Sequence, residues 1–207
     1  EDRYGAAASL LKSWRQEQVL TREAQPAFGY YVETYQLPDG TTCDRIGLLA
    51  TVQVEPFSSG NIRPHERTFA RAKADRMKVL QACQTNLSPI FGLYSNPPDV
   101  LAPAQQLAAT QAPDMDIHDD SGRHHRFWFI RDADALAQIT AAFQNDTIMI
   151  ADGHHRYETA LAYRDAQHAA GHTDPAAAHN FLLMHLTSLH DPCLLYTSDA
   201  ADDVLCV

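Results

Sequence analysis

The order of apolar and polar positions along the chain predicts both helices and strands. Residues 6–19 carry apolar side chains at helical spacing, with Leu10, Leu11 and Trp14 on one stripe. The segment 132–143 begins at Asp132, whose carboxylate suits the first turn of a helix. The further helices that the pattern predicts span residues 70–85 and 154–170.

Aromatic and β-branched segments predict strands in the rest of the chain. Two pairs of such segments flank turn residues and predict β-hairpins. Continuous apolar runs predict buried strands. The hairpins pair residues 28–35 with 45–54 and 115–118 with 125–130, and the buried strands span 88–94, 147–151 and 181–189. In the second hairpin Trp128 is expected on one face of the sheet, and Phe127 and Phe129 on the other. We expect an α+β fold with a mixed sheet, two β-hairpins and packed helices.

Two segments carry no strong pattern. Residues 61–69 are read as a polar connection, and residues 97–103, with three prolines, as a loop holding a weak helical turn.

Both ends of the chain suggest a fragment. The chain enters a helical pattern without an initiator methionine, so the true N-terminus is expected upstream. The string from Cys193 to Asp203 resembles a translated sequencing adapter, so residues 193–207 are expected to be non-native and poorly packed. Residues 1–192 would then form a single truncated domain. The alternative is a genuine acidic C-terminal tail.

Composition narrows the classes of partner and the compartment. The formal net charge is −10, and −7 without the three aspartates of the C-terminal string, which makes nucleic acid an unlikely partner. The one denser basic run, residues 63–78, alternates with acidic and apolar residues and fits a solvated helix face. Cys43 and Cys83 are isolated, and no stretch approaches the roughly 18 apolar residues of a membrane span. We expect a cytoplasmic protein without a membrane partner.

The most informative segment is the predicted turn between a buried strand and the helix 154–170. Gly153 permits an unusual backbone conformation and the close approach of an anion. The first amides of a helix are unsatisfied and carry partial positive charge, so they attract anions. His154, His155 and Arg156 add donors in the same turn. The pattern predicts a phosphate-binding turn over residues 152–156.

Two other interpretations of this turn stay open at this stage. Asp152 could simply cap the helix, with His154, His155 and Arg156 in solvent and Glu158 paired to them. A zinc site is the weaker alternative, because adjacent histidines diverge by about 100° on a helix and no HExxH motif or spaced cysteine set is present. We therefore predict no metal ligands from this protein.

Residues 63–68 form a second candidate site ahead of the helix 70–85. Glu66 could serve as a general base on a substrate hydroxyl, with His65 as an acid or a phosphate contact. The alternative is a capping arrangement for the following helix. Asp75 and Arg76, further along that helix, are read as a surface pair.

The acidic segment 114–122 invites a calcium interpretation. Its spacing lacks the glycine and the terminal glutamate of an EF-hand loop, so a polar hairpin connection is favoured. Nucleophile motifs of the G-x-S-x-G type are absent from the sequence.

Three motifs together carry a family resemblance. Residues 63–68 (RPHERT), 86–94 (NLSPIFGLY) and 150–160 (IADGHHRYETA) resemble a large prokaryotic domain-of-unknown-function family, number ten-fifteen, in the right order and over about residues 4–190. The resemblance implies that segments of that family upstream and past residue 190 are missing from this chain.

The turn at residues 152–156 is also similar to the phosphate-binding box of the ParB/sulfiredoxin superfamily. Its members include CTP-binding partition proteins, ATP-using sulfiredoxins and a free-serine kinase with a similar histidine-containing turn. The resemblance implies that Asp152, Gly153, His154, His155 and Arg156 bind nucleotide phosphates, and more loosely that Glu66 is a catalytic base. Sulfiredoxin chemistry is disfavoured, because His154 stands where that turn has its catalytic cysteine.

These observations lead to one leading hypothesis with alternatives. We expect a nucleotide-dependent phosphotransferase acting on a small hydroxyl-bearing molecule, with Glu66 and His65 catalytic and with a nucleoside di- or triphosphate and Mg²⁺ as cofactors. The alternatives are a non-catalytic nucleotide-sensing or regulatory module and, less favoured, a DNA-partition role. The sequence leaves the acceptor, the base and the oligomeric state open. A separation beyond roughly 12 Å between Glu66 and the turn would exclude a shared small substrate.

Overall fold

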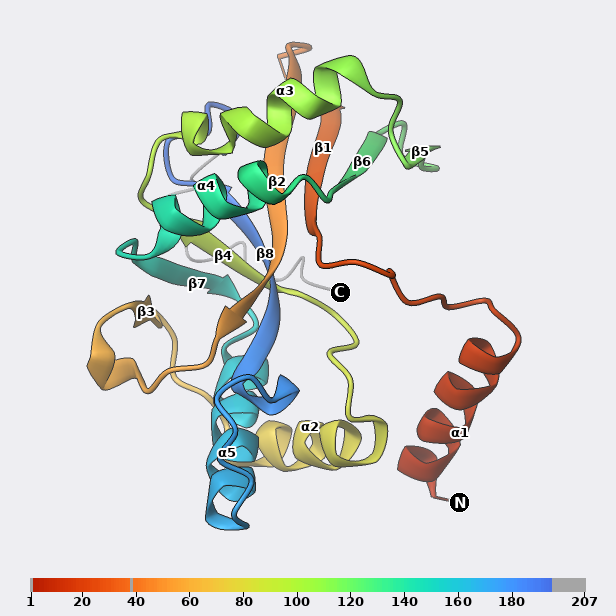
Figure 1. The fold of residues 1–207 in the computed structure, drawn as a ribbon, viewed down its shortest axis with the longest axis vertical. Coiled ribbons are helices and arrows are strands. Elements are labelled where there is room, and N and C mark those ends of the chain that lie inside the picture. Colours follow the sequence, from red (N-terminus) through yellow and green to blue (C-terminus); the bar gives the residue numbers. More distant parts are fainter. Residues whose placement is uncertain (1, 38, 195–207) are drawn as a thin grey trace.

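The computed structural model describes residues 2–37 and 39–194, and one eight-stranded sheet organises them, in the order β3-β7-β4-β8-β2-β1-β6-β5 (Figure 1). The strands are β1 (Phe28–Gln36), β2 (Thr42–Gln53), β3 (Ile62–Arg63), β4 (Ile90–Tyr94), β5 (Met115–His118), β6 (His124–Ile130), β7 (Ile148–Asp152) and β8 (Phe181–Ser188). The helices are α1 (Arg3–Gln16), α2 (Ala70–Cys83), α3 (Ala102–Thr110), α4 (Ala133–Phe143) and α5 (His154–Ala169).

Both predicted hairpins are confirmed. β1 pairs antiparallel with β2, and β5 pairs antiparallel with β6. Because β1 also pairs antiparallel with β6, the two hairpins join into one half of the sheet. Trp128 is buried on one face of β6, and Phe127 and Phe129 lie on the other, as the alternation predicts.

The other half of the sheet contains the parallel pairs. β4 lies parallel to β8 and antiparallel to β7, and β3 lies parallel to β7. The sheet is therefore mixed, and the α+β fold class is confirmed. The two-residue strand β3 was not predicted, because a pairing this short leaves no periodic pattern; Ile62, only 3% exposed, fixes it to the core.

The sequence interpretation of residues 97–103 as a loop with a weak helical turn was right about the turn but missed the helix α3 that follows it. A short 3-10 turn, Pro98–Leu101, leads directly into α3, which has a proline in its first turn. A proline there costs no hydrogen bond, because the first amides of a helix have no partner within it. The prolines therefore mark the start of α3 rather than a break.

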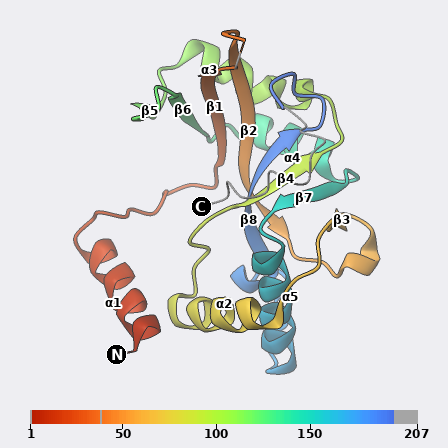
Figure 2. The same cartoon turned by 180° about the vertical axis from the view of Figure 1, so that it is seen from behind.

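Helices α3 and α4 cover one face of the sheet, as the two opposite views in Figures 1 and 2 show. Leu101, Ala104 and Ile139 are fully buried against that face. The indole of Trp128 donates to the carbonyl of Gln111, at the end of α3, across 3.1 Å. Burial of these apolar side chains holds the helices on the sheet.

Helices α5 and α2 pack together at the end of the molecule away from α3 and α4 (Figure 1). α1 packs against α2, where the hydroxyl of Tyr4 donates to Asp75 across 2.7 Å. Asp75 also pairs with Arg3, so its expected pairing with Arg76 is replaced by contacts to α1.

The predicted boundary at residue 193 stays a prediction. Cys193 is 5% exposed, and its carbonyl accepts a hydrogen bond from Tyr35 across 2.6 Å. Residues 195–207 of the predicted tail lie outside the described residues. Within the described part of the chain, none of the helices has the length and hydropathy to cross a membrane.

Candidate functional site

The site begins where β7 ends and α5 starts. Gly153 connects them with φ +100° and ψ 24°, a left-handed conformation that costs other residues about 1–2 kcal/mol. A Cβ at this position would also lie 2.9 Å from Nη2 of Arg156. The turn therefore needs glycine for its backbone conformation, and a Cβ there would force the end of the Arg156 side chain to move.

Gly153 occupies the N-cap position of α5 and offers no side-chain acceptor to the helix. Asp152 was considered as a helix cap, and that interpretation was wrong, because its carboxylate contacts Arg156 instead. The first amides of α5 therefore donate no hydrogen bond to a capping side chain. Together with the helix dipole, they make a local anion-binding position.

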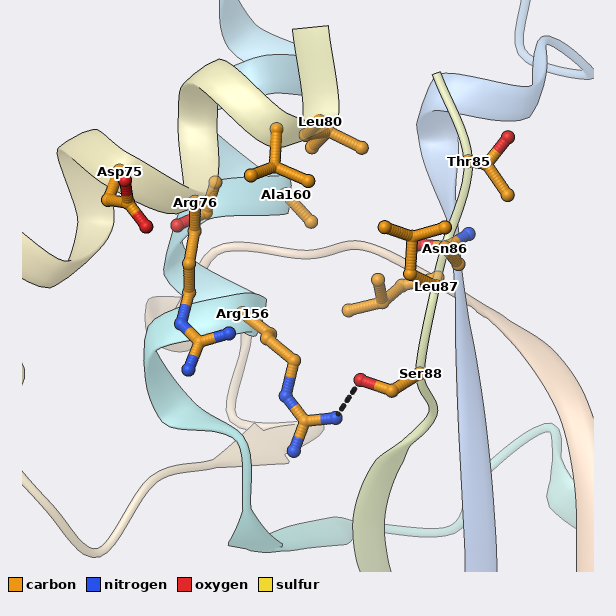
Figure 3. A pocket seen from close by; sticks show the side chains of 12 residues that line it. Asp75, Arg76, Leu80, Thr85, Asn86, Leu87, Ser88, Arg156 and Ala160 are labelled. Atoms are coloured by element: carbon orange, nitrogen blue, oxygen red, sulfur yellow. Dashed lines mark hydrogen bonds between the residues drawn. The ribbon is translucent and has the colours of Figure 1, made fainter. Parts of the chain in front are cut away.

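Arg156 is fixed by partners from two segments. Its Nη1 donates to Oγ of Ser88 across 2.8 Å (Figure 3). Nη1 also donates to the carbonyl of Pro89, and Nη2 donates to Asp152. The arginine side chain is 22% exposed, whereas the Asp152 side chain is 63% exposed. The guanidinium is held rigidly at the turn, and one carboxylate already offsets part of its charge.

His154 is turned inward rather than toward solvent. The residue is 2% exposed, and its Nε2 accepts a hydrogen bond from the backbone amide of His65 across 3.2 Å. Burial, followed by the nearby His65, lowers the pKa of His154, so the ring is neutral. The expectation that His154 adds a donor for an anion at the turn is corrected accordingly.

The bond to Nε2 also fixes the tautomer of His154. A nitrogen that accepts a hydrogen bond carries no proton, so the proton of the neutral ring is on Nδ1. This Nδ1 lies 3.5 Å from Oε2 of Glu66. The buried imidazole therefore directs an N–H group toward the carboxylate of Glu66.

His65 and Glu66 lie directly beside the turn, well within the roughly 12 Å that a shared small substrate could span. Nδ1 of His65 donates to the carbonyl of Ile150 across 2.7 Å, and its ring meets that of His154 edge-on, with centroids 4.4 Å apart. Nε2 of His65 lies 3.8 Å from Oε1 of Glu66. The Glu66 side chain is 53% exposed, so its carboxylate is open to a ligand.

The alternative interpretation of residues 63–68 as a helix cap was wrong. The N-cap residue of α2 is Phe69, and no side-chain bond caps the helix. The backbone amide of Phe69 donates to Nε2 of His155 across 3.0 Å, and the two rings stack. His155 thus joins the starts of α2 and α5.

Glu158 ties the same two helices together one turn later. Its carboxylate accepts from Oγ1 of Thr68 across 2.7 Å and from Nζ of Lys73 across 2.6 Å. Burial raises the pKa of Glu158, but the hydrogen bonds from Lys73 and Thr68 outweigh it and the net shift is downward. Glu158 is therefore hydrogen-bonded to Thr68 and Lys73. The interpretation in which the histidines are solvated required Glu158 to pair with them, and it was wrong.

A small cavity of about 170 Å³ adjoins Arg156, between α2, α5 and the segment before β4 (Figure 3). Arg76 of α2 and Arg156 of α5 both line it, together with Ser88. Among the described residues, no carboxylate lies within ion-pair distance of Arg76. Sequence reasoning missed Arg76, because only the packing of α2 against α5 brings it near the turn.

His65, Glu66 and His154 also resemble a set of metal ligands, since one ligand atom of each lies within 4.8 Å of the others. A metal on Nδ1 of His154 would displace the proton there while Nε2 still accepts the amide of His65. Both ring nitrogens would then be deprotonated, a state far from the neutral form that imidazole ligands adopt. The hydrogen-bond geometry favours a proton-handling site over a metal site.

Comparisons with known proteins give one result. The sequence model of a family described as "Protein of unknown function (DUF1015)" matches residues 1–196, a range that contains every residue of the site. No curated protein and no solved structure matches the chain significantly.

Proposed function

The chain belongs to the DUF1015 family, and we propose that it is a nucleotide-dependent phosphotransferase that acts on a small hydroxyl-bearing molecule. The observation that carries this proposal is the position of Glu66. Its half-exposed carboxylate lies 3.5 Å from the buried imidazole of His154. His154 begins α5, whose first amides have no side-chain cap. A base and an anion-binding position therefore share one small region.

In this proposal the turn at residues 152–156 holds the nucleotide phosphates. The amides that open α5 donate to phosphate oxygens, and Arg156 adds a charge-assisted contact. Arg76 lines the adjoining cavity and extends the positive surface. The similarity of this turn to the ParB/sulfiredoxin phosphate-binding box supports the same role.

Mg²⁺ would neutralise charge on the phosphates during transfer. The carboxylate of Asp152, 63% exposed at the turn, would offer an oxygen ligand, which fits the preference of Mg²⁺ for oxygen.

Glu66 would activate the acceptor. As the acceptor oxygen bonds to the terminal phosphorus, its proton passes to the carboxylate of Glu66. The bond from that phosphorus to the bridging oxygen breaks, and the nucleotide leaves with one phosphoryl group fewer. The Nδ1–H group of His154 orients the carboxylate, and His65, anchored to Ile150, limits its movement.

A non-catalytic nucleotide sensor is the second candidate, and one observation favours it. Arg156 already has Asp152, Ser88 and Pro89 as partners. A bound phosphate would compete with Asp152 for the guanidinium group, and such an exchange of partners is suited to a switch.

Calorimetric titration with nucleoside di- and triphosphates, each with Mg²⁺, tests binding. Incubation of the best-bound nucleotide with a panel of small alcohols, hydroxy acids and amino acids tests transfer. A phosphorylated acceptor supports the phosphotransferase. Tight binding without product, across the whole panel, favours the sensor, and the absence of nucleotide binding excludes both.

A further inference from the structure

The hairpin β5–β6 places a second cluster of polar side chains far from the turn. β5 is the last strand of the sheet, and it lies at the opposite end from α5 (Figure 1). The sequence of this segment suggested calcium only through its aspartates. The structure adds a histidine from the neighbouring strand, which changes the chemistry of the cluster.

Strand register brings two imidazoles together. His118 of β5 lies opposite His124 of β6, and their rings stack with centroids 4.1 Å apart and 7° between their planes. Asp116 precedes His118 by two residues and so shares its face of the strand. Nε2 of His124 lies 2.6 Å from Oδ1 of Asp116. One ligand atom of each residue lies within 4.8 Å of the others.

The charged side chains nearby have partners of their own, so Asp116, His118 and His124 are available to bind a cation. Asp119, at the turn, accepts hydrogen bonds from Ser121, Arg123 and His125, so it is committed to the hairpin itself. Arg123, which lines the same hollow as the two histidines, is paired with Glu33. Arg126, opposite Asp116 in the strand register, is paired with Asp44. Their charges are therefore partly offset, which lowers the electrostatic cost of placing a cation near Asp116.

The cluster also has space around it. His118 and His124 line a polar hollow between the ends of the two hairpins, together with Thr34 and Thr42. β5 is exposed along its whole length, so the side chains of Asp116 and His118 can rotate without repacking the core. Water molecules can complete a coordination shell in such a hollow.

We propose that Asp116, His118 and His124 form a binding site for a divalent transition-metal ion of the Zn²⁺ type. Two imidazoles and one carboxylate match the ligand preference of Zn²⁺, Co²⁺ and Ni²⁺, and the absence of an oxygen-rich shell argues against Ca²⁺ and Mg²⁺. Binding would replace the contact between His124 and Asp116 with two metal bonds. It would also cross-link β5 to β6 at the open edge of the sheet.

Tag-free protein, treated with a chelator and dialysed, is titrated with ZnCl₂ by calorimetry and with CoCl₂ by visible absorption. We expect one saturable equivalent of metal. His118→Gln and His124→Gln should each weaken binding at least about tenfold, and Asp116→Asn should also weaken it. These side chains are outside the core, so circular dichroism should show an unchanged fold.

His172→Gln serves as the matched control, because His172 is also exposed and bonds only to its own loop and the end of α5. Glu66→Gln tests whether the metal ion binds instead to the cluster of His65, Glu66 and His154. Binding that is lost in both hairpin histidine variants and kept in both controls supports the site. The proposal is overturned if no saturable binding occurs, or if binding survives both hairpin substitutions.

Discussion

The backbone amide of His65 donates to Nε2 of His154 across 3.2 Å, and this bond joins the loop before α2 to the first turn of α5. It determines which nitrogen of a buried imidazole keeps its proton, and it directs that proton toward Glu66. The proposed division of work follows from this contact: the turn holds an anion, and Glu66 accepts a proton.

Replacing the proposed base should separate binding from chemistry. Glu66→Gln keeps the size of the side chain and removes its basicity, so we expect phosphotransfer to fall by about 10²- to 10⁴-fold. Nucleotide affinity should change little, because Glu66 contacts the histidines rather than the helix amides. Steady-state kinetics and calorimetry on the same preparation measure the two quantities. Glu17→Gln, at the exposed C-cap position of α1, is the control.

Two glycines with similar backbone conformations allow a matched test of the turn. Gly153 has φ +100° and Gly171 has φ +92°, so alanine at either position should destabilise the fold by about 1–2 kcal/mol. Only at Gly153 would the new Cβ meet Arg156; nothing lies within 4 Å at Gly171. Thermal unfolding should show similar losses of stability. Nucleotide affinity should fall only in Gly153→Ala, and equal affinity of the two variants would remove the turn from the binding site.

The geometry of Arg156 predicts that lysine cannot replace it. The guanidinium group contacts Ser88, Pro89 and Asp152 at once, and an ammonium group cannot present the same planar set of donors. Arg156→Lys should therefore weaken nucleotide binding by roughly tenfold, about 1.4 kcal/mol. Arg131→Lys is the control, because Arg131 lies on the far side of the sheet and pairs with Glu23. Wild-type affinity in Arg156→Lys would show that positive charge alone suffices.

The fold and the two hairpins follow directly from the alternation of apolar residues, because side-chain burial on a sheet has a period of two. β3 and α3 could not be predicted in the same way. β3 is two residues long and is defined only by its partner β7. α3 begins with prolines that also occur in loops. Both elements depend on tertiary contacts rather than on local pattern.

The site was predictable as a set of residues but not as an arrangement. The motif identified the turn and Glu66, and the structure brings them together. The burial of His154, the pairing of Arg156 with Asp152 and the approach of Arg76 all depend on contacts across more than one element. A charge count along the sequence treats His154 and Arg156 as free cations, whereas His154 is buried and neutral and Arg156 is paired with Asp152.

A half-buried histidine on the sheet, His185, should make stability depend on pH. Burial lowers the pKa of His185 to about 4, below its ordinary value near 6.5. Between about pH 6.5 and pH 4, His185 is therefore protonated in the unfolded chain and neutral in the folded chain. The free energy of unfolding is highest above about pH 6.5 and decreases as the pH falls toward 4. The free energy of unfolding should decrease by at most about 3 kcal/mol. Solvent screening at this partly exposed ring makes the decrease smaller.

Urea unfolding of the wild type and of His185→Leu between pH 4 and 8 measures this effect. The variant should be less stable at pH 8, because His185 packs against Tyr31 and Phe91, and its stability should change less with pH. His172→Leu, at an exposed loop position, should keep the slope of the wild type. Parallel pH profiles for all three proteins would show that His185 titrates normally in the folded state.

The most direct test of the central claim is a ³¹P NMR spectrum of the protein with Mg²⁺, a bound nucleotide and a mixture of small hydroxyl compounds. For the wild type, a new phosphomonoester resonance should grow as the terminal phosphate resonance declines, and Glu66→Gln should suppress both changes by at least about 100-fold. An unchanged spectrum for the wild type, or equal rates for the wild type and Glu66→Gln, would contradict the assignment of Glu66 as the base of a phosphotransferase.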